Sequence, residues 1–197
     1  MKHLVQKQLA QSIATMQATL ADQHIADTVV TIAELTANSM RAGGKLMVAG
    51  NGGSAADAQH LVAEFVVRLV SNRPALRAIA LTTDTSIITA AGNDFSYDCI
   101  FARQVEALGQ PGDVFLGIST SGNSKNILQA VQQAKEMNVT TVGFSGNGGG
   151  KMRELCDHNV IIPSDVTMNI QECHLALEHI FCLAVEHFYF GEGFGSR

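Results

Sequence analysis

Short apolar runs alternate with helical patterns along most of this 197-residue chain. Five runs have the length and composition of buried strands: 45–49, 76–81, 113–118, 140–145 and 159–162. Segments with helical periodicity follow them, at 55–70, 97–108, 124–137, 151–157 and 168–190. Because such alternation is typical of βαβ units, it predicts an α/β fold with a five-stranded parallel sheet and helices on both faces. The usual connection rules favour the strand order 2-1-3-4-5.

The first 43 residues have a different pattern. Apolar residues recur three and four positions apart there, at Leu4, Leu9, Ile13, Met16 and Leu20, and again at Val29, Ile32, Leu35 and Met40. This spacing predicts two helices, the second of which ends at Gly43 and Gly44. We therefore expect residues 1–43 to form a helical pair that packs on the domain and between subunits, and residues 44–197 to form the α/β domain.

Composition argues against several classes of protein. The chain carries 13 basic and 18 acidic residues, a formal charge of −5, and no cluster of lysine or arginine, which argues against a nucleic-acid surface. No apolar stretch has the length of a membrane span or a signal peptide, so we expect no membrane contact and a cytoplasmic location. The four cysteines have no CxxC spacing and predict reduced, buried thiols: Cys99, Cys156, Cys173 and Cys182.

A glycine-rich loop, GNGGSAAD, follows the first predicted strand and opens a helix. Ser54, with Asp57 three positions later, predicts a helix start with a side-chain cap. The N–H groups and the positive dipole end at such a start can bind an anion without a lysine. The Walker pattern is absent, and Gly50, Gly52 and Ala55 match only the loose G-x-G-x-x-A dinucleotide fingerprint. A tight turn with no ligand is the alternative.

A second loop, residues 119–124 with the sequence STSGNS, lies between another predicted strand and helix. Its four hydroxyls, on Ser119, Thr120, Ser121 and Ser124, can donate hydrogen bonds to the oxygens of a phosphate monoester. A nucleophilic serine is the rival interpretation, but it needs an adjacent general base, and the sequence has no G-x-S-x-G elbow. The composition of the loop therefore favours a phosphate site.

Polar residues interrupt two largely apolar helical segments. His60 and Glu64 are four positions apart and share one helix face, and Gln171 and His179 are eight apart and lie within about 80° of each other. In apolar surroundings these side chains favour a pocket over open water. A solvated pair, or a histidine with a structural hydrogen bond, is the alternative. Other polar positions on the last helix are His174, Glu178 and His187.

Three segments, GNGGSAADAQH, GISTSGNS and IQECHLALEH, together resemble the sugar isomerase (SIS) family, and most closely its phosphoheptose isomerases. The resemblance extends over nearly the whole chain. It implies a single SIS domain with a flavodoxin-like sheet and an N-terminal helical extension. It also implies conversion of sedoheptulose 7-phosphate to D-glycero-D-manno-heptose 7-phosphate, the first step of nucleotide-activated heptose synthesis for lipopolysaccharide or capsule, by a homotetramer with sites at subunit contacts.

The resemblance further implies roles for individual residues. Glu64 and His179 would be the acid–base pair, and one zinc ion per subunit would be bound by His60, Glu64, Gln171 and His179, with no nucleotide cofactor. The residues that would bind the sugar phosphate are Asn51, Gly52, Gly53, Ser54, Glu64, Asn93, Asp94, Ser119, Thr120, Ser121, Ser124 and Gln171. Some relatives have an acidic residue where this chain has Met168, so a sugar-hydroxyl contact from that position is not carried over.

The implied reaction needs two titratable groups beside one edge of the substrate. Interconversion of a 2-ketose and an aldose removes a proton from C1 and returns one to C2 through an enediol, which a carboxylate base and an imidazole acid can serve. A bound zinc ion would polarise the carbonyl. Because a metal-bound imidazole nitrogen cannot also move a proton, either the metal or His179 does the electrophilic work, and both remain open.

Three other functions are alternatives. A non-catalytic SIS-domain tetramer that binds a protein partner, such as a replication initiator, would be expected to lack the acid–base positions, which are present here. A sugar-phosphate-sensing regulator would need a DNA-binding module, for which the chain has no room. A dinucleotide enzyme would need an acidic residue about 20 positions after the first glycine, whereas Asp84 follows Gly50 by 34 positions.

Overall fold

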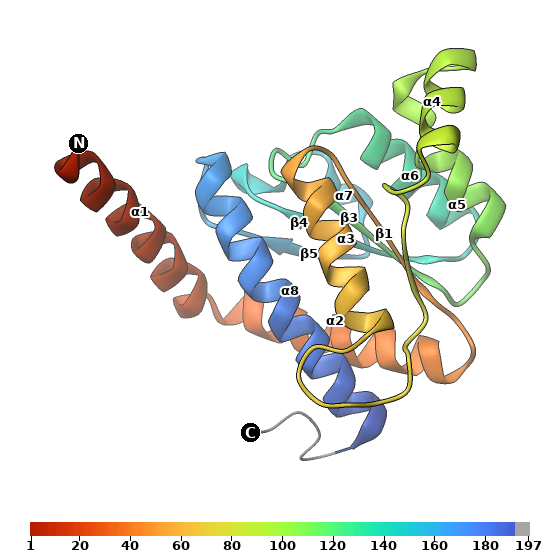
Figure 1. Cartoon of the computed structure of the whole chain (residues 1–197), viewed down its shortest axis with the longest axis horizontal. Helices are drawn as coiled ribbons and strands as arrows, with labels where there is room; N and C mark the ends of the chain where they lie inside the picture. Colours follow the sequence, from red (N-terminus) through yellow and green to blue (C-terminus); the bar gives the residue numbers. More distant parts are fainter. Residues whose placement is uncertain (192–197) are drawn as a thin grey trace.

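The structure is a computed structural model that describes residues 1–191. Five strands form one sheet in the order β2-β1-β3-β4-β5, which confirms the predicted α/β class and strand order (Figure 1). The strands are β1 (Leu46–Gly50), β2 (Ala78–Ala80), β3 (Val114–Ser119), β4 (Thr140–Ser145) and β5 (His158–Ile161). All neighbouring pairs are parallel, so the five carboxyl ends lie at one edge of the sheet.

Helices precede the sheet and connect its strands. The N-terminal helices are α1 (Lys2–Ala21) and α2 (Gln23–Arg41), as the periodicity predicts. The helices of the α/β part are α3 (Gly53–Val66), α4 (Thr85–Asp94), α5 (Ala102–Leu108), α6 (Lys125–Glu136), α7 (Met152–Leu155) and α8 (Thr167–Phe190), with short 3-10 turns η1 (Tyr97–Cys99) and η2 (Asn147–Gly149). The end of the predicted range 44–197, residues 192–197, lies outside the described residues.

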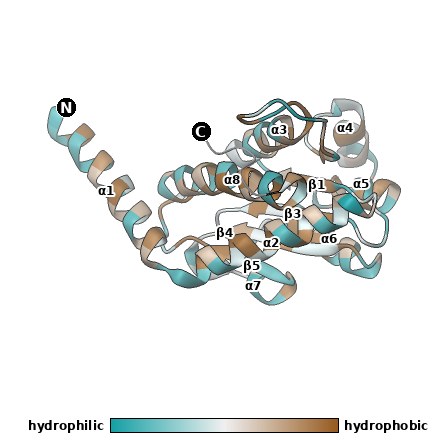
Figure 2. Cartoon of the chain, turned by 90° about the horizontal axis from the view of Figure 1, so that it is seen from below, coloured by the Kyte–Doolittle hydropathy of each residue, from teal (hydrophilic) through white to brown (hydrophobic). Residues whose placement is uncertain are grey.

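Two hydrophobic cores cover the two faces of the sheet. Alternate residues of a strand point to opposite faces, so Leu116 packs with α2, α3 and α8, whereas its neighbour Phe115 packs with α4, α5 and α6. β1 and β3 are buried along their whole length, as expected for central strands that are covered on both sides. This layering places α3 and α8 on the same face of the sheet, where they lie side by side (Figures 1 and 2).

Several elements differ in extent from the sequence prediction. The strand predicted over 76–81 has only three residues, because β2 is an edge strand that pairs with β1 alone. The helix predicted over 97–108 is divided into η1 and α5. α4 was not predicted: it is rich in Thr, has one buried residue, Ala91, and so gives little apolar periodicity. Its N-terminus is capped by Asp84, whose carboxylate accepts from the Ile87 N–H at 2.9 Å.

The predicted side-chain cap at Ser54 is wrong. α3 begins at Gly53, its N-cap is Gly52, and no side chain caps it. Ser54 therefore lies inside the first turn, where it is 4% exposed. The N-cap, Gly52, has φ +56°, a conformation that favours glycine, and this explains why the helix begins two residues earlier than a serine cap at position 54 requires.

α1 projects away from the sheet (Figures 1 and 2). Large apolar side chains on it are exposed, and they include Leu4, Val5, Leu9, Ile13 and Leu20. Across residues 1–191, no helix combines the length and the hydropathy needed to cross a membrane.

The four cysteines are free thiols. Cys156, Cys173 and Cys182 are buried, as predicted, whereas Cys99 is half-buried. Burial is the main cause that raises the pKa of the Cys156 and Cys182 thiols to about 12. These two thiols are therefore protonated and unreactive at neutral pH.

Candidate active site

Both predicted ligand loops lie at the carboxyl edge of the sheet. β1 and β3 are neighbours with Gly50 opposite Ile118, so the loops that follow them meet. Asn51 in the first loop and Asn126 at the start of α6 exchange two amide hydrogen bonds, at 2.9 and 2.8 Å. The Tyr97 hydroxyl adds a third, to Asn51 Oδ1 at 3.2 Å. This amide pair holds the glycine loop against the start of α6, directly after the serine loop, which confirms that the two loops are neighbours.

Two positions of the glycine loop have no space for a side chain. A Cβ on Gly50 would collide with the main chain of Ser54, and a Cβ on Gly53 would collide with the side-chain amide of Gln171. The chain therefore turns tightly from β1 into α3, and the start of α3 contacts the first part of α8. No side chain caps α3, so the positive end of its dipole remains available to an anion.

The serine loop gathers three hydroxyls. Ser119 Oγ lies 2.9 Å from Ser124 Oγ and 3.5 Å from Ser121 Oγ. Backbone N–H groups also point to these hydroxyls: that of Asn123 donates to Ser121 Oγ at 3.2 Å. Thr120, the fourth predicted residue, is half-buried, and its carbonyl oxygen accepts from the Gly146 N–H at 3.0 Å. Hydroxyls packed this closely, beside the start of α6, can donate together to one anion.

A cluster of titratable groups lies between α3 and α8. His60 Nε2 is 3.1 Å from Glu64 Oε1 and 3.4 Å from His179 Nε2. The two imidazole rings meet edge to face, with centroids 5.0 Å apart. The side chains of His60 and Glu64 are 43% and 18% exposed, so the cluster is open to a small molecule. The structure thus brings together three of the four predicted metal ligands, including both predicted acid–base residues.

The donor atoms of this cluster suit a metal ion. One ligand atom from each of His60, Glu64 and His179 lies within 4.8 Å of the others. Two imidazole nitrogens and a carboxylate oxygen are donors that zinc takes in catalytic sites. Gln171, the fourth predicted ligand, is placed differently: its amide lies against Gly53, and eight residues of α8 separate it from His179, a rise of about 12 Å.

Asn93 and Asp94 lie apart from the other predicted residues. They end α4, both are exposed, and Asn93 Nδ2 donates to Asp94 Oδ1 at 2.9 Å. Within residues 1–191, neither makes a hydrogen bond to the glycine loop or to the serine loop. Met168, in the first turn of α8, is 52% exposed.

α8 also carries buried polar groups that are not among the predicted site residues. Burial lowers the pKa of His174 to about 4, and its Nε2 donates to the Ser145 carbonyl oxygen at 3.0 Å. Burial, with the nearby charge of Asp57, raises the pKa of Glu178 to about 8. Glu186 forms a buried ion pair with Arg73 at 2.5 Å. Sequence reasoning missed Arg73 and Glu186: Glu186 is a charged residue inside a largely apolar helix, which was a signal, whereas Arg73 lies in the segment between α3 and β2, where no pattern marks it.

Comparison with known proteins agrees with this geometry. The sequence pattern of the SIS domain matches residues 8–146. A phosphoheptose isomerase of Burkholderia pseudomallei (strain 1710b) is 54% identical over 184 residues, 93% of each chain. The solved structure of a phosphoheptose isomerase from Neisseria gonorrhoeae is 40% identical, with a TM-score of 0.87, and covers 93% of this chain and 97% of that chain. A phosphoheptose isomerase from Francisella tularensis is 34% identical, with a TM-score of 0.89 over 93% and 96% of the two chains.

These matches extend over nearly the whole chain and include the two ligand loops and the helices that carry the titratable cluster. An identity of 54% over 184 residues shows that the two proteins share a fold and a family. The chain belongs to the SIS-domain family and, within it, to the phosphoheptose isomerases.

Proposed function

We propose that this enzyme converts sedoheptulose 7-phosphate to D-glycero-D-manno-heptose 7-phosphate through an enediol intermediate. One observation carries the proposal: α3 begins at the glycine loop and carries the His60–Glu64 pair, which meets His179 from α8. An anion site at one end of a helix and titratable groups further along it suit a substrate with a phosphate at one end and a carbonyl at the other. The names of the relatives support a heptose phosphate as substrate.

The phosphate would bind in the crevice between the two loops. Ser119, Ser121 and Ser124 would donate their hydroxyls, because Ser121 Oγ and Ser124 Oγ both already lie within 3.5 Å of Ser119 Oγ. Thr120 and the residues of the glycine loop would complete the phosphate site: Asn51, Gly52, Gly53 and Ser54. The uncapped N-termini of α3 and α6 add favourable electrostatics for a dianion.

The sugar would lie along α3 toward the titratable cluster. Gln171 would contact it, and the position of its amide against Gly53 at the start of α3 supports this role. We assign sugar binding also to Asn93 and Asp94. These two residues lie apart from the loops within one chain, so this assignment requires that they reach a site on another subunit.

Glu64 would remove the proton from C1, and His179 would transfer protons to and from the substrate oxygens on C1 and C2. The carboxylate is half-exposed, and among residues 1–191 its hydrogen-bond partner is His60, so it can accept a proton from a bound substrate. His60 Nε2 lies within 3.4 Å of both the Glu64 carboxylate and His179 Nε2, so a base and an acid would face one small space. Each group is expected to contribute about 10²- to 10⁴-fold to turnover.

We also propose one zinc ion per subunit, held by His60, Glu64 and His179, with Gln171 as a fourth ligand after a change of its side-chain conformation. The close approach of two imidazole nitrogens and a carboxylate oxygen supports this assignment. When bound, zinc would polarise the substrate carbonyl and stabilise negative charge on its oxygen. In that state His179 would hold the ion and would not itself transfer a proton.

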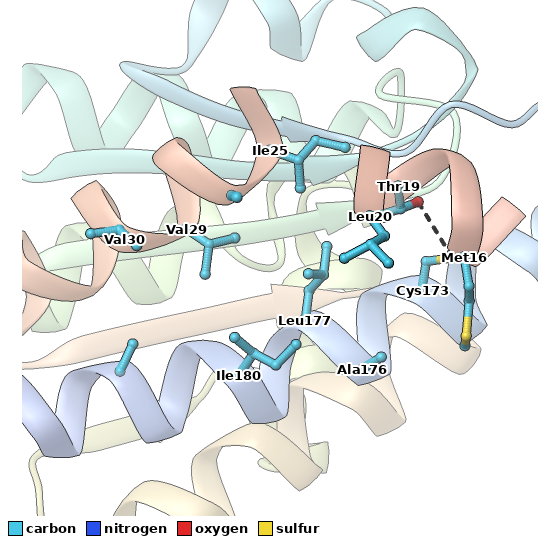
Figure 3. Close-up of a pocket in the computed structure, with 12 residues that line it drawn as sticks. Met16, Thr19, Leu20, Ile25, Val29, Val30, Cys173, Ala176, Leu177 and Ile180 are labelled. Atoms are coloured by element: carbon cyan, nitrogen blue, oxygen red, sulfur yellow. Dashed lines mark hydrogen bonds between the residues drawn. The ribbon is translucent and has the colours of Figure 1, made fainter. Parts of the chain in front are cut away.

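The proposal includes a homotetramer with active sites at subunit contacts, in which the helical pair 1–43 packs between subunits and residues 44–197 form the isomerase domain. A groove of about 360 Å³ between α1, α2 and α8 supports it (Figure 3). Its lining is apolar apart from Thr19, whose hydroxyl donates to Cys173 Sγ at 3.8 Å. An apolar groove beside a projecting apolar helix is typical of surfaces that become buried between subunits.

We further propose that the enzyme acts in the cytoplasm, on the first step of nucleotide-activated heptose synthesis for lipopolysaccharide or capsule. The heptose chemistry in the names of the relatives supports this placement. The thiols support it as well, since four free cysteines are typical of a reducing compartment.

Turnover of sedoheptulose 7-phosphate by two variants tests the proposed roles. Glu64→Gln and His179→Gln are each expected to lower kcat by at least about 10²-fold, while sedoheptulose 7-phosphate still binds in a calorimetric titration. Glu106→Gln and His24→Gln, on exposed helix positions, are matched controls and are expected to keep wild-type turnover. Wild-type turnover by Glu64→Gln would contradict the proposed base, and a wild-type protein without turnover would favour a partner-binding scaffold.

Metal content is measured on the same preparations. About one equivalent of zinc per chain in wild-type protein purified without chelator, and a clear loss in His60→Gln, is the expected result. Less than a tenth of an equivalent together with full activity would contradict the zinc assignment.

A further inference from the structure

Arg73 lies in the segment between α3 and β2, yet its side chain is buried. This segment passes the lower ends of α3 and α8 in Figure 1. The Arg73 Nε donates to Glu186 Oε1 of α8 at 2.5 Å, and both side chains have 0% exposure. A buried guanidinium is stable only when its charge and its donors are satisfied, so the ion pair fixes where the group lies.

The remaining donors of Arg73 bind the end of α3. One terminal nitrogen donates to the main-chain oxygen of Glu64 at 2.6 Å, and the other donates to those of Phe65 at 2.7 Å and Pro74 at 3.0 Å. The last carbonyl groups of a helix have no partners within the helix, and α3 ends at Val66, so Arg73 supplies partners that the helix itself lacks. Arg73 thus binds the turn of α3 that carries the Glu64 carboxylate.

The same guanidinium therefore joins the two helices of the titratable cluster. Glu64 belongs to the last turn of α3, and His179 lies two turns before Glu186 on α8. Helix ends fray unless they are tied down, and a displacement of 1 Å at a reacting group can cost about 10²-fold in rate. Holding the last turn of α3 against α8 keeps Glu64 within reach of His60 at 3.1 Å, and His60 within reach of His179.

We propose that Arg73, anchored by Glu186, is a positioning residue for the isomerisation: it fixes the Glu64 carboxylate relative to His179 without touching the substrate. The proposal rests on the role proposed above for Glu64. It assigns a function to a pair of residues 113 positions apart that no motif of the sequence marks.

Arg73→Met, which keeps the length of the side chain and removes its donors, is the main test. We expect kcat for sedoheptulose 7-phosphate to fall about 10- to 100-fold with KM changed less than about threefold, because the phosphate loops lie at the other end of α3. Arg73→Lys is expected to recover part of the lost kcat, since an ammonium group can still donate to a carbonyl oxygen and pair with Glu186. Glu186→Gln is expected to lie between wild type and Arg73→Met.

A double-variant comparison separates positioning from stability. If Arg73 acts through Glu64, Arg73→Met adds no further loss of kcat in a Glu64→Gln background. Asp113→Asn is the matched control: Asp113, just before β3, is 1% exposed and pairs with Lys45, just before β1, and neither residue belongs to the titratable cluster. It is expected to lower the thermal midpoint as Arg73→Met does, and to leave kcat unchanged below that midpoint.

The outcomes are distinguishable. Wild-type kcat in folded Arg73→Met, or a loss no greater than that in Asp113→Asn, overturns the inference. The same holds if the losses from Arg73→Met and Glu64→Gln multiply in the double variant. If Arg73→Met does not fold, an unchanged kcat in both Arg73→Lys and Glu186→Gln also overturns it. Full activity in Glu64→Gln alone would instead remove the proposed base, which is a separate failure.

Discussion

Replacing His174 with glutamine is expected to remove part of the acid sensitivity of the fold. This histidine has 0% exposure, its Nε2 donates to the Ser145 carbonyl oxygen at 3.0 Å, and its Nδ1 has no hydrogen-bond partner. Burial lowers its pKa from 6.5 to about 4, against the smaller opposite effect of the hydrogen bond to Ser145. The side chain is therefore neutral in the folded protein at pH values where it is charged in the unfolded chain.

The sign and the magnitude follow from proton linkage. Between about pH 6.5 and pH 4 the unfolded chain holds a proton at His174 that the folded chain does not, so the free energy of unfolding falls as the pH falls. This contribution to stability is fully present above pH 6.5 and is lost by about pH 4. At about 1.4 kcal/mol for each pH unit, it amounts to about 3 kcal/mol.

Urea unfolding of wild type and His174→Gln, at equal protein concentration and at steps from pH 7 to pH 4.5, measures the effect. Glutamine can donate from Nε2 to the Ser145 carbonyl oxygen but does not titrate. The unfolding free energy of wild type should therefore fall more steeply than that of His174→Gln, by about 2 to 3 kcal/mol over this range. His24→Gln, at an exposed position, should follow wild type. Parallel pH profiles of wild type and His174→Gln would refute the reasoning.

Two further predictions concern the serine loop. Ser121→Ala removes one hydroxyl from the proposed phosphate site and should raise KM about 10- to 100-fold with little change in kcat. This corresponds to a loss of about 1.5 to 3 kcal/mol of binding free energy. A fall in kcat at constant KM in steady-state kinetics would contradict this prediction. Gly122→Ala should lower the free energy of unfolding in urea by more than the control Gly148→Ala. Both glycines have positive φ, +64° and +73°, so both variants have backbone strain, but only at Gly122 would the added Cβ collide with the Gly149 carbonyl. An equal loss of unfolding free energy in the two variants would contradict this prediction, because the collision with Gly149 would then add no cost.

The central part of the sheet was predictable because its strands are buried on both faces. The strands predicted at 113–118 and 140–145 agree with β3 and β4 within a residue, since uninterrupted apolar runs occur only where both faces are covered. The edge of the fold was less predictable. β2 and α4 have few buried residues, so the sequence carries little of the periodicity by which such elements are recognised.

The site was predictable where its residues are close in sequence. The hydroxyls of the serine loop, and the His60–Glu64 pair at helical spacing, follow from local patterns. Contacts between segments that are distant in the sequence could not be predicted from local patterns. The approach of His179 to His60 followed only from family resemblance, and the Gln171–Gly53 contact depends on how α8 lies along α3, which no local pattern encodes.

Because α3 carries both the proposed anion site and the titratable pair, helix geometry fixes their separation. Seven residues from Gly53 to His60 are a rise of about 10 Å, and α8 makes contacts at both points, through Gln171 and His179. One residue inserted between them would turn every later side chain by about 100° and move His60 and Glu64 off the face that α8 covers. In the proposed site, the length of substrate that can be accommodated would therefore be set by the number of residues between Gly53 and His60 within this helix.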